Sequence, residues 1–414
     1  MPARPPQSTT TRTARDALRA LPATVWLLGW ASLLTDIASE MAFPLLPAFI
    51  VSLGAAPTFL GLVEGIANAL ASGMSLASTR LTRAGRPAKG FILLGYGLGT
   101  LARPMFALAQ VPWHVMGARS IDRLGKGLRS APRDALLAAV VPPNATGRAF
   151  GVHRAMDHAG AVIGPLLAFA LLAARIPTRW IFAAATLPAT LALLVLMRLP
   201  GAPPSASLES DSLAAAAAAP PDQTRATTTA RAGTALLLIQ YLLTAAESFA
   251  LLRAATCHVT LAHLPLVWAG LHVVKVAAAA QGGRMVDRFT AGRVLAVGLA
   301  IGAVAFALLA MARTSVGYGF AMLGMGMRYG LCEAAERAFV ATTARARDDR
   351  HAFGSYHFVV GITAIPNGLL VGALWQHIGG TTTLGLSAIV CALCAVAWWA
   401  MVRKANGLAS RAVA

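Results

Sequence analysis

Long apolar segments, separated by short polar or basic stretches, follow one another from Val25 almost to the end of the chain. Each segment has about 20 residues, the length that a helix needs to cross roughly 30 Å of hydrocarbon. Turn residues and basic clusters divide the sequence into twelve segments, which we predict to be membrane-spanning helices. Their expected starts are Val25, Pro57, Gly90, Trp113, Gly151, Trp180, Thr234, Leu264, Arg293, Val316, Phe353 and Thr381.

A longer polar stretch at residues 199–233 interrupts the apolar pattern near the middle of the chain. It is rich in Pro, Ala, Ser and Thr, a composition typical of a flexible linker. We therefore divide the chain into a cytoplasmic tail (1–24), a six-helix bundle (25–198), a cytoplasmic linker (199–233), a second six-helix bundle (234–402) and a cytoplasmic tail (403–414).

An internal repeat at an offset of about 203 residues relates the two predicted bundles. The matching residues are Gly127 with Gly330, and Ala149, Phe150 and Gly151 with Ala352, Phe353 and Gly354. Since six predicted helices separate the copies, the two halves have the same orientation in the membrane. The expected fold is an all-α membrane protein, with twelve transmembrane helices in two pseudo-symmetric six-helix bundles.

Composition and charge agree with a chain that is embedded in the lipid bilayer. Hydrophobic residues make up 57% of the 414 and charged residues only 12%, against about 25% in ordinary soluble domains. The net charge of +19 would favour nucleic acid as the partner of a soluble protein, but most basic residues lie between the apolar segments. Because cytoplasmic loops are rich in Lys and Arg, we predict a multi-pass protein of the bacterial inner membrane with both termini cytoplasmic, and no nucleic-acid partner.

Four short motifs lie at the ends of predicted helices or within them. They are STRLTRAGR (Ser78 to Arg86), RSIDRLGKG (Arg119 to Gly127), GAVIGP (Gly160 to Pro165) and GRMVDRFTAGR (Gly283 to Arg293). With the repeat and the helix count, they resemble the motifs of the major facilitator superfamily over essentially the whole chain. In the first motif Thr82 stands where that family has an Asp, and in the last two extra residues precede Gly292.

The resemblance implies a secondary transporter that works by alternating access around a site between its halves. It also implies that two loop motifs gate the cytoplasmic side, with Asp287 and Arg288 in a latch. The gating or loop residues are Arg83, Gly85, Arg86, Gly283, Asp287 and Arg288. Gly160, Gly164 and Pro165 resemble the start of a motif of proton-driven antiporters, whereas the two glycines alone indicate a small-residue face for helix packing.

Charged residues far from the ends of apolar segments are the candidates for transport chemistry, because burying them in hydrocarbon is costly. Asp36 and Glu40 share one face of the first predicted helix, about 16 and 22 Å from its start. The fourth predicted helix carries a basic stripe at overlapping depth, formed by Arg119, Arg123, Lys126 and Arg133. Further candidates for the cavity are Asp157 and, in the second half, Glu247.

Two interpretations of these charges remain open from the sequence. In one, Asp36 and Glu40 pair with Arg119 or Arg123 and hold the first half together, while Arg129, Arg133 and Asp134 form ion pairs near the membrane surface. In the other, a carboxylate binds a proton or a cationic substrate, and the basic stripe attracts an anionic group. We expect at least one of Asp36 and Glu40 to be needed for transport.

The predicted function is proton-coupled secondary transport of a small solute by a monomer, with efflux preferred over uptake. No cofactor or bound metal is expected. The alternatives are an uptake carrier for a metal ion or metal chelate, prompted by the spacing of His153 and Met156, and a non-transporting sensor or scaffold on a transporter fold. No P-loop, H-E-x-x-H or G-x-S-x-G motif occurs, so the sequence does not predict an enzyme.

Overall fold

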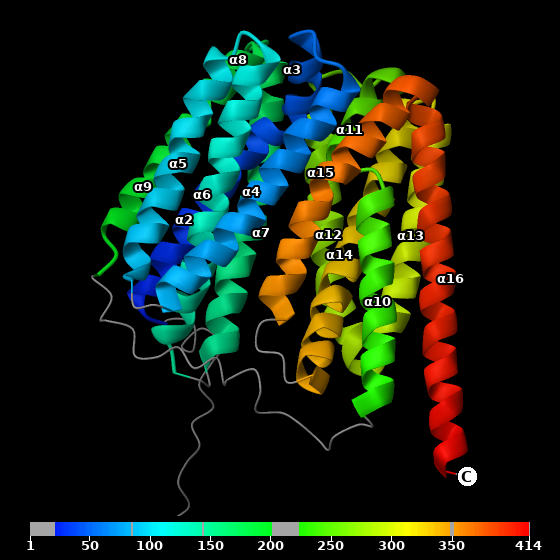
Figure 1. The fold of residues 1–414 in the computed structure, drawn as a ribbon. Coiled ribbons are helices and arrows are strands. Elements are labelled where there is room, and N and C mark those ends of the chain that lie inside the picture. The colour runs from blue at the N-terminus through cyan, green and yellow to red at the C-terminus, as the bar shows by residue number, and fades with distance from the viewer. Residues whose placement is uncertain (1–20, 84–85, 143–144, 201–222, 348–351, 414) are drawn as a thin grey trace, which may run out of the picture.

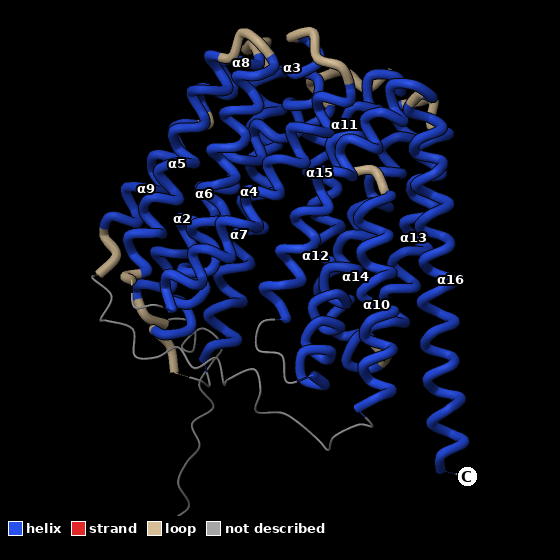
Figure 2. Tube along the Cα trace, in the orientation of Figure 1, coloured by secondary structure: helices blue, strands red, loops and turns tan. Residues whose placement is uncertain are grey.

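The computed structural model describes residues 21–83, 86–142, 145–200, 223–347 and 352–413, and in these ranges it is built from helices without a strand (Figure 2). The first half contains α2 (Ala23–Ala42), η1 (Phe43–Leu45), α3 (Leu46–Ser52), α4 (Pro57–Arg83), α5 (Ala88–Leu108), α6 (Pro112–Ala139), α7 (Thr146–Ala173), α8 (Thr178–Ala184) and α9 (Thr186–Met197). The second half contains α10 (Gln223–Leu243), α11 (Glu247–Arg253), η4 (Ala254–Cys257), α12 (Leu264–Arg288), α13 (Ala291–Met311), α14 (Ser315–Arg347), α15 (Ala352–Ile378) and α16 (Gly380–Val413).

These elements make twelve membrane crossings in the described part of the chain, as the sequence predicts. Ten of the crossings are long and apolar enough by composition alone to span a bilayer. The other two are α6 and α14, which are equally long but carry several charged side chains. The structure therefore places the most highly charged helices of the chain among its transmembrane helices.

The two halves form separate bundles that lie side by side, and α2 begins at the same end of the molecule at which α16 ends (Figure 1). Their pseudo-symmetry is visible in the glycines of the repeat. Gly127 of α6 packs against α4, where an added Cβ would lie 3.0 Å from the Cβ of Met74. Gly330 of α14 packs in the same way against α12, 2.7 Å from the Cβ of Ala278. The sequence repeat thus encodes equivalent close helix pairs in the two bundles.

Two crossings contain a break in the helix, and each break lies next to a charged side chain. Because proline cannot continue the hydrogen bonding of a helix, Pro44 converts the end of α2 into the 3₁₀ turn η1 just after Glu40. A second break separates α10 from α11, and there Asn367 donates hydrogen bonds to the carbonyls of Leu242 and Thr244. Backbone groups freed at a break in hydrocarbon need such partners. This second break places Glu247 at the start of α11.

The halves touch along α4 with α15, α7 with α12, and α3 with α11. The contact between α4 and α15 is backbone to backbone, because Gly61 lies directly against Gly368. At the end of the molecule opposite to Ala23 and Arg403, the Thr58 hydroxyl donates to Oε1 of Gln376 at 2.9 Å, and the rings of Phe169 and His263 lie 6.0 Å apart. The described parts of the two halves are thus joined at that end.

Candidate functional site

Glu40 joins the two halves within the membrane-spanning region. Its Oε2 accepts a hydrogen bond of 2.8 Å from the indole N–H of Trp268 on α12, and lies 3.6 Å from Nε2 of His272 one turn further along. The Glu40 side chain remains 20% exposed, whereas the His272 side chain is 10% exposed. A carboxylate of the first half is thus held by the second half and remains partly exposed.

Asp36 lies one helical turn before Glu40 and is partly buried, but no hydrogen bond or ion pair joins it to any residue that the structure describes. The sequence interpretation in which Asp36 and Glu40 pair with Arg119 or Arg123 is therefore wrong. Arg119 is unavailable to them because its guanidinium is already occupied by Glu64 of α4. The physical reason is that α4 and α6 pack closely and bring Glu64 nearer.

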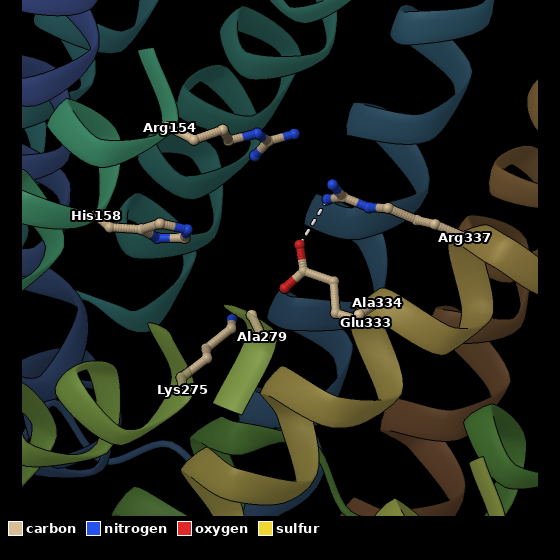
Figure 3. Close-up of a pocket in the computed structure, with 7 residues that line it drawn as sticks. All are labelled: Arg154, His158, Lys275, Ala279, Glu333, Ala334 and Arg337. Carbon is tan, nitrogen blue, oxygen red and sulfur yellow. Dashed lines mark hydrogen bonds and ion pairs between the residues drawn. The ribbon is translucent and has the colours of Figure 1, made fainter. Parts of the chain in front are cut away.

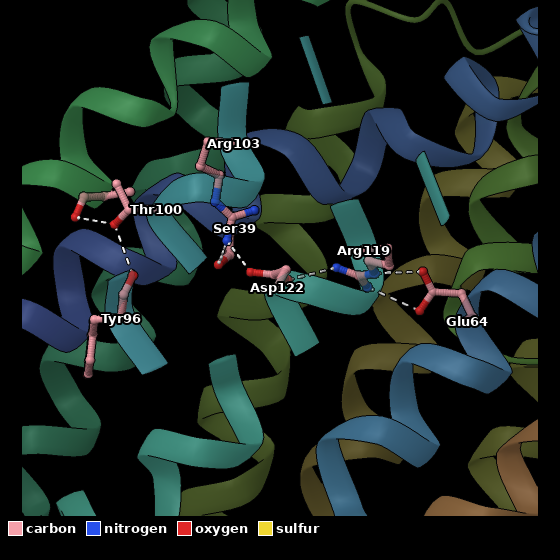
Figure 4. Close-up of polar contacts among 8 residues, drawn as sticks. Ser39, Glu64, Tyr96, Thr100, Arg103, Arg119 and Asp122 are labelled. Carbon is pink, nitrogen blue, oxygen red and sulfur yellow. Dashed lines mark hydrogen bonds and ion pairs between the residues drawn. The ribbon is translucent and has the colours of Figure 1, made fainter. Parts of the chain in front are cut away.

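Arg119 belongs to a buried network of charged side chains inside the first half (Figure 4). Arg119 donates two hydrogen bonds to the Glu64 carboxylate, at 3.0 and 3.1 Å, and its Nη1 lies 3.5 Å from Asp122. Asp122 also accepts a 2.7 Å hydrogen bond from Arg103 of α5, which in turn donates to Ser39 of α2 at 2.9 Å. The network thus ties four helices together, and its members compensate one another in charge.

Three members of this network, Glu64, Arg103 and Asp122, were not among the residues that the sequence marked as candidates. A signal for two of them was present, since Glu64 and Arg103 are ionisable residues inside the apolar segments that became α4 and α5. Buried charges of opposite sign on neighbouring helices are expected to pair, because an unpaired one is costly in hydrocarbon.

The other basic residues of α6 have separate surroundings. Arg123 is partly buried and its Nε has no hydrogen-bond partner among the described residues, whereas the side chain of Lys126 is exposed. Arg133 pairs with its neighbour Asp134 at 2.9 Å. Arg129, expected in an ion pair near the surface, instead lies over the ring of Tyr96 at 4.4 Å from its centre. The basic residues of α6 therefore do not form one continuous surface with a common role.

An aromatic contact connects the charge network with Glu40. The guanidinium of Arg119 lies 4.9 Å from the centre of the Phe43 ring, and that ring lies 5.2 Å from the ring of Trp268. Trp268 is the residue that donates to Glu40, and it is almost fully buried. A continuous series of side-chain contacts through Trp268 and Phe43 thus connects Glu40 with the network.

The glycines of α7 bring Asp157 into the neighbourhood of the α2 carboxylates. An added Cβ at Gly160 would lie 3.0 Å from the Cβ of Asp36, and one at Gly164 would lie 3.1 Å from the Cβ of Glu40. One turn before Gly160, Asp157 accepts a 2.5 Å hydrogen bond from Ser32 of α2. Pro165 is buried inside α7. These glycines lie against the same helix face that carries Asp36 and Glu40.

In the second half, Glu247 lies close enough to Lys275 for their charges to interact. Lys275 of α12 experiences the charges of Glu247, Glu333 and Glu40, and its ammonium lies 5.8 Å from the centre of the Tyr329 ring. Glu247 is partly buried at the start of α11. The structure thus brings Glu247 and Glu40 from different halves to the surroundings of one lysine.

The gating motif of the second half is located on a helix and not in a loop. Gly283, Asp287 and Arg288 lie in the last turns of α12, because the helix continues to Arg288 before the chain turns at Phe289. Asp287 and Arg288 are exposed. In the first half, Arg86 follows α4 and is exposed, while Gly85 and the side chain of Arg83 lie outside the described residues.

A cavity of about 180 Å³ lies between the two halves, where α7 faces α12 and α14 (Figure 3). Its lining residues are Arg154, His158, Lys275, Ala279, Glu333, Ala334 and Arg337. Their positions in the first part of α7 and the later part of α14 place the cavity toward the end of the molecule that carries Ala23 and Arg403. Within the described ranges, no group of three or more His, Cys, Asp or Glu side chains is arranged to hold a metal ion.

The fold and this arrangement can be compared with known proteins. Residues 28–366 match the family model of the Major Facilitator Superfamily. The chain belongs to this superfamily. The match covers most of both helical bundles, so the resemblance drawn from the motifs is confirmed, and membership supports transport of a small solute across a membrane.

Relatives in this superfamily match the chain to different extents. An uncharacterized MFS-type transporter of Methanocaldococcus jannaschii is 35% identical over 36% of this chain and 37% of its own length. An uncharacterized protein of Mycobacterium tuberculosis is 28% identical over 88% of this chain and 90% of its own. The multidrug resistance protein MdtH of Edwardsiella ictaluri is 31% identical, over 34% of this chain and 35% of its own.

Solved structures of transporters share the same fold at low sequence identity. The nucleoside transporter NupG superposes with a TM-score of 0.70 at 14% identity, covering 91% of this chain and 99% of that one. A bacterial homologue of the human drug peptide transporters superposes with a TM-score of 0.71 at 15% identity, covering 93% and 99%. At such identities the similarity concerns the fold alone.

Proposed function

We propose that this chain is a secondary active transporter that exports a small solute by alternating access, coupled to protons through Glu40. The observation that carries the proposal is the contact of Glu40 with Trp268 and His272 across the interface between the halves. An ionisable group held between two moving bodies changes its surroundings when they move, which is the requirement for binding and releasing a proton during a cycle. Asp36, on the same face, is the second carboxylate of this proposal.

The positions of the contacts and the cavity support an inward-facing conformation. The halves are joined at the end that carries Thr58 and Gln376, whereas the cavity lies toward the end that carries Ala23 and Arg403. The excess of Lys and Arg in the segments at the latter end favours its placement in the cytoplasm. In this arrangement the cavity opens toward the cytoplasm, a state through which exporters and importers both pass.

Two observations favour export over uptake. The relatives named multidrug resistance protein align with about a third of the chain. The segment around Gly160, which resembles part of a motif of proton-driven antiporters, packs against the helix that carries Glu40. Antiport would use the inward flow of protons to drive solute out of the cytoplasm.

Transport by the purified full-length chain in proteoliposomes tests the proposal. With an imposed pH gradient, we expect at least one solute of a broad panel to move against its concentration gradient, and a protonophore to abolish that movement. The readout is solute flux together with the change in internal pH. Solute-dependent conformational change without flux would instead favour the sensor or scaffold alternative.

The orientation of the protein provides a separate prediction. Gln110, in the turn between α5 and α6, and Arg198, at the end of α9, are both exposed. Since the four native cysteines are buried, cysteines introduced at these two positions can be labelled against a low background. In intact cells an impermeant maleimide should modify residue 110 and spare residue 198. The reverse pattern would place the chain termini outside the cytoplasm.

A further inference from the structure

We propose that the cavity between α7, α12 and α14 binds the anionic group, a carboxylate or a phosphate, of an organic solute. This inference rests on the proposed function, because it names the chemical class of the solute that the transporter carries. Its basis is a set of basic side chains from both halves that converge on one space and lack sufficient partners (Figure 3).

Two of these cations have unused hydrogen-bond donors. Lys275 is partly buried, and no hydrogen bond or ion pair joins its ammonium to any residue that the structure describes. Arg154 lies 3.9 Å from Asp157, which is too far for a hydrogen bond, and the nearer oxygen interaction of Asp157 is with Ser32. Buried or half-buried donors in a protein are normally satisfied, so the ammonium of Lys275 is available to a ligand, and the Arg154 side chain, which is 40% exposed, can donate to the same ligand.

The charge of the cavity is also unbalanced. Arg154, Lys275 and Arg337 place three positive charges in the cavity lining against the single carboxylate of Glu333, which accepts a 2.5 Å hydrogen bond from Arg337 and none from the other two. His158 adds a ring nitrogen that can donate to an anion. Between low-dielectric helices, an excess of positive charge attracts anions more strongly than it would in water. Carboxylate and phosphate oxygens provide the acceptors that Arg and Lys bind best.

The position of the site would link binding to movement of the halves. Arg154 and His158 belong to α7 of the first half, while Lys275 and Arg337 belong to α12 and α14 of the second. An anion that accepts hydrogen bonds from both sets stabilises the conformation in which the halves approach each other at this end. The competing explanation is that Arg154 pairs with Glu333 when the halves close and serves only as a gate.

The experiment measures binding of three pairs of probes to the full-length protein in lipid nanodiscs by isothermal titration calorimetry. Each pair compares an anion with a neutral molecule of similar shape: benzoate with benzamide, phenyl phosphate with phenyl sulfonamide, and succinate with succinamide. We expect at least one anion to bind about tenfold or more tightly than its neutral counterpart, since a charge-assisted hydrogen bond contributes at least that factor.

Two variants locate the binding site. Lys275→Gln and Arg154→Gln should each weaken binding of the selected anion by about tenfold. Arg148→Gln is the matched control, because Arg148 is an exposed arginine on the same helix as Arg154 and lies outside the cavity lining; it should leave the affinity unchanged. Size-exclusion profiles and melting temperatures establish that each variant is folded before binding is measured.

Three results would overturn the inference: no anion binds better than its neutral counterpart, both cavity variants keep the parent affinity, or Arg148→Gln weakens binding as much as they do. Variants that slow solute flux but keep the anion affinity would favour the gate explanation and also overturn it. Failure of the proposed function is distinguishable, since proton-driven flux of a neutral or cationic solute would survive loss of the anion site.

Discussion

Replacing Glu40 by Gln is expected to reduce gradient-driven transport by about tenfold or more, because the coupled cycle then has no proton to carry at this position. Glutamine keeps a carbonyl oxygen that can accept the hydrogen bond now made by Trp268 at 2.8 Å. The variant should therefore fold, bind solute and exchange it down its gradient. The measurement is solute flux in proteoliposomes with and without an imposed pH gradient.

The comparison with Asp36→Asn separates the two carboxylates of α2. Asp36 has no hydrogen bond or ion pair in the described structure, whereas Glu40 contacts the opposite half. If Glu40→Gln keeps full pH-dependent transport and Asp36→Asn loses it, Asp36 and not Glu40 is the coupling residue, and our assignment is wrong. If both variants retain full coupling, proton movement through α2 is excluded. Asp134→Asn controls for loss of a carboxylate away from the interface.

Replacing Asp122 by Asn should have the largest effect on stability. The change removes the negative charge that lies 2.7 Å from Arg103 and 3.5 Å from Arg119, so that Glu64 is left as the one carboxylate for two buried guanidinium groups, although the asparagine oxygen can still accept a hydrogen bond from Arg103. Breaking a buried ion pair by removing one partner costs about 3–5 kcal/mol. We expect a marked fall in the melting temperature of the purified protein and lower yield in the membrane, both measured against the parent chain.

Two further variants make this prediction specific to the network. Asp134→Asn removes a carboxylate that is 41% exposed from the same helix, where an ion pair is worth about 0–1 kcal/mol, so its melting temperature should stay near the parent value. The double variant Arg103→Met with Asp122→Leu should recover part of the lost stability, because it leaves no unpaired charge between α5 and α6. Equal destabilisation by the single and double variants would contradict the ion-pair explanation.

The fold could be predicted closely because the bilayer imposes a length and a composition on every crossing. Pro57 and Leu264, for example, are both predicted and observed helix starts. The start of the seventh crossing differs from the prediction at Thr234. Helix α10 begins at Gln223, within the predicted linker, because a polar segment next to an apolar one can continue its helix beyond the membrane.

The partners of individual charges could be predicted much less well. The sequence indicated that Arg119 lies at the depth of Asp36 and Glu40, but depth does not determine which neighbouring helix is nearest. The close contact at Gly127 brings α6 near α4, so that Arg119 forms its ion pair with Glu64. Likewise, Trp268 and His272 are far from Glu40 in sequence, and their convergence depends on how the two bundles meet.

The charge network also constrains how the first bundle can be assembled during synthesis. Helix α6 is too polar to be stable alone in hydrocarbon, and it emerges from the ribosome after α4 and α5, which carry Glu64 and Arg103. In the folded bundle, the charges of Glu64 on α4 and Arg103 on α5 are both paired with residues of α6. Integration of this bundle is then a joint event for α4, α5 and α6, in which the third helix completes the membrane entry of the first two.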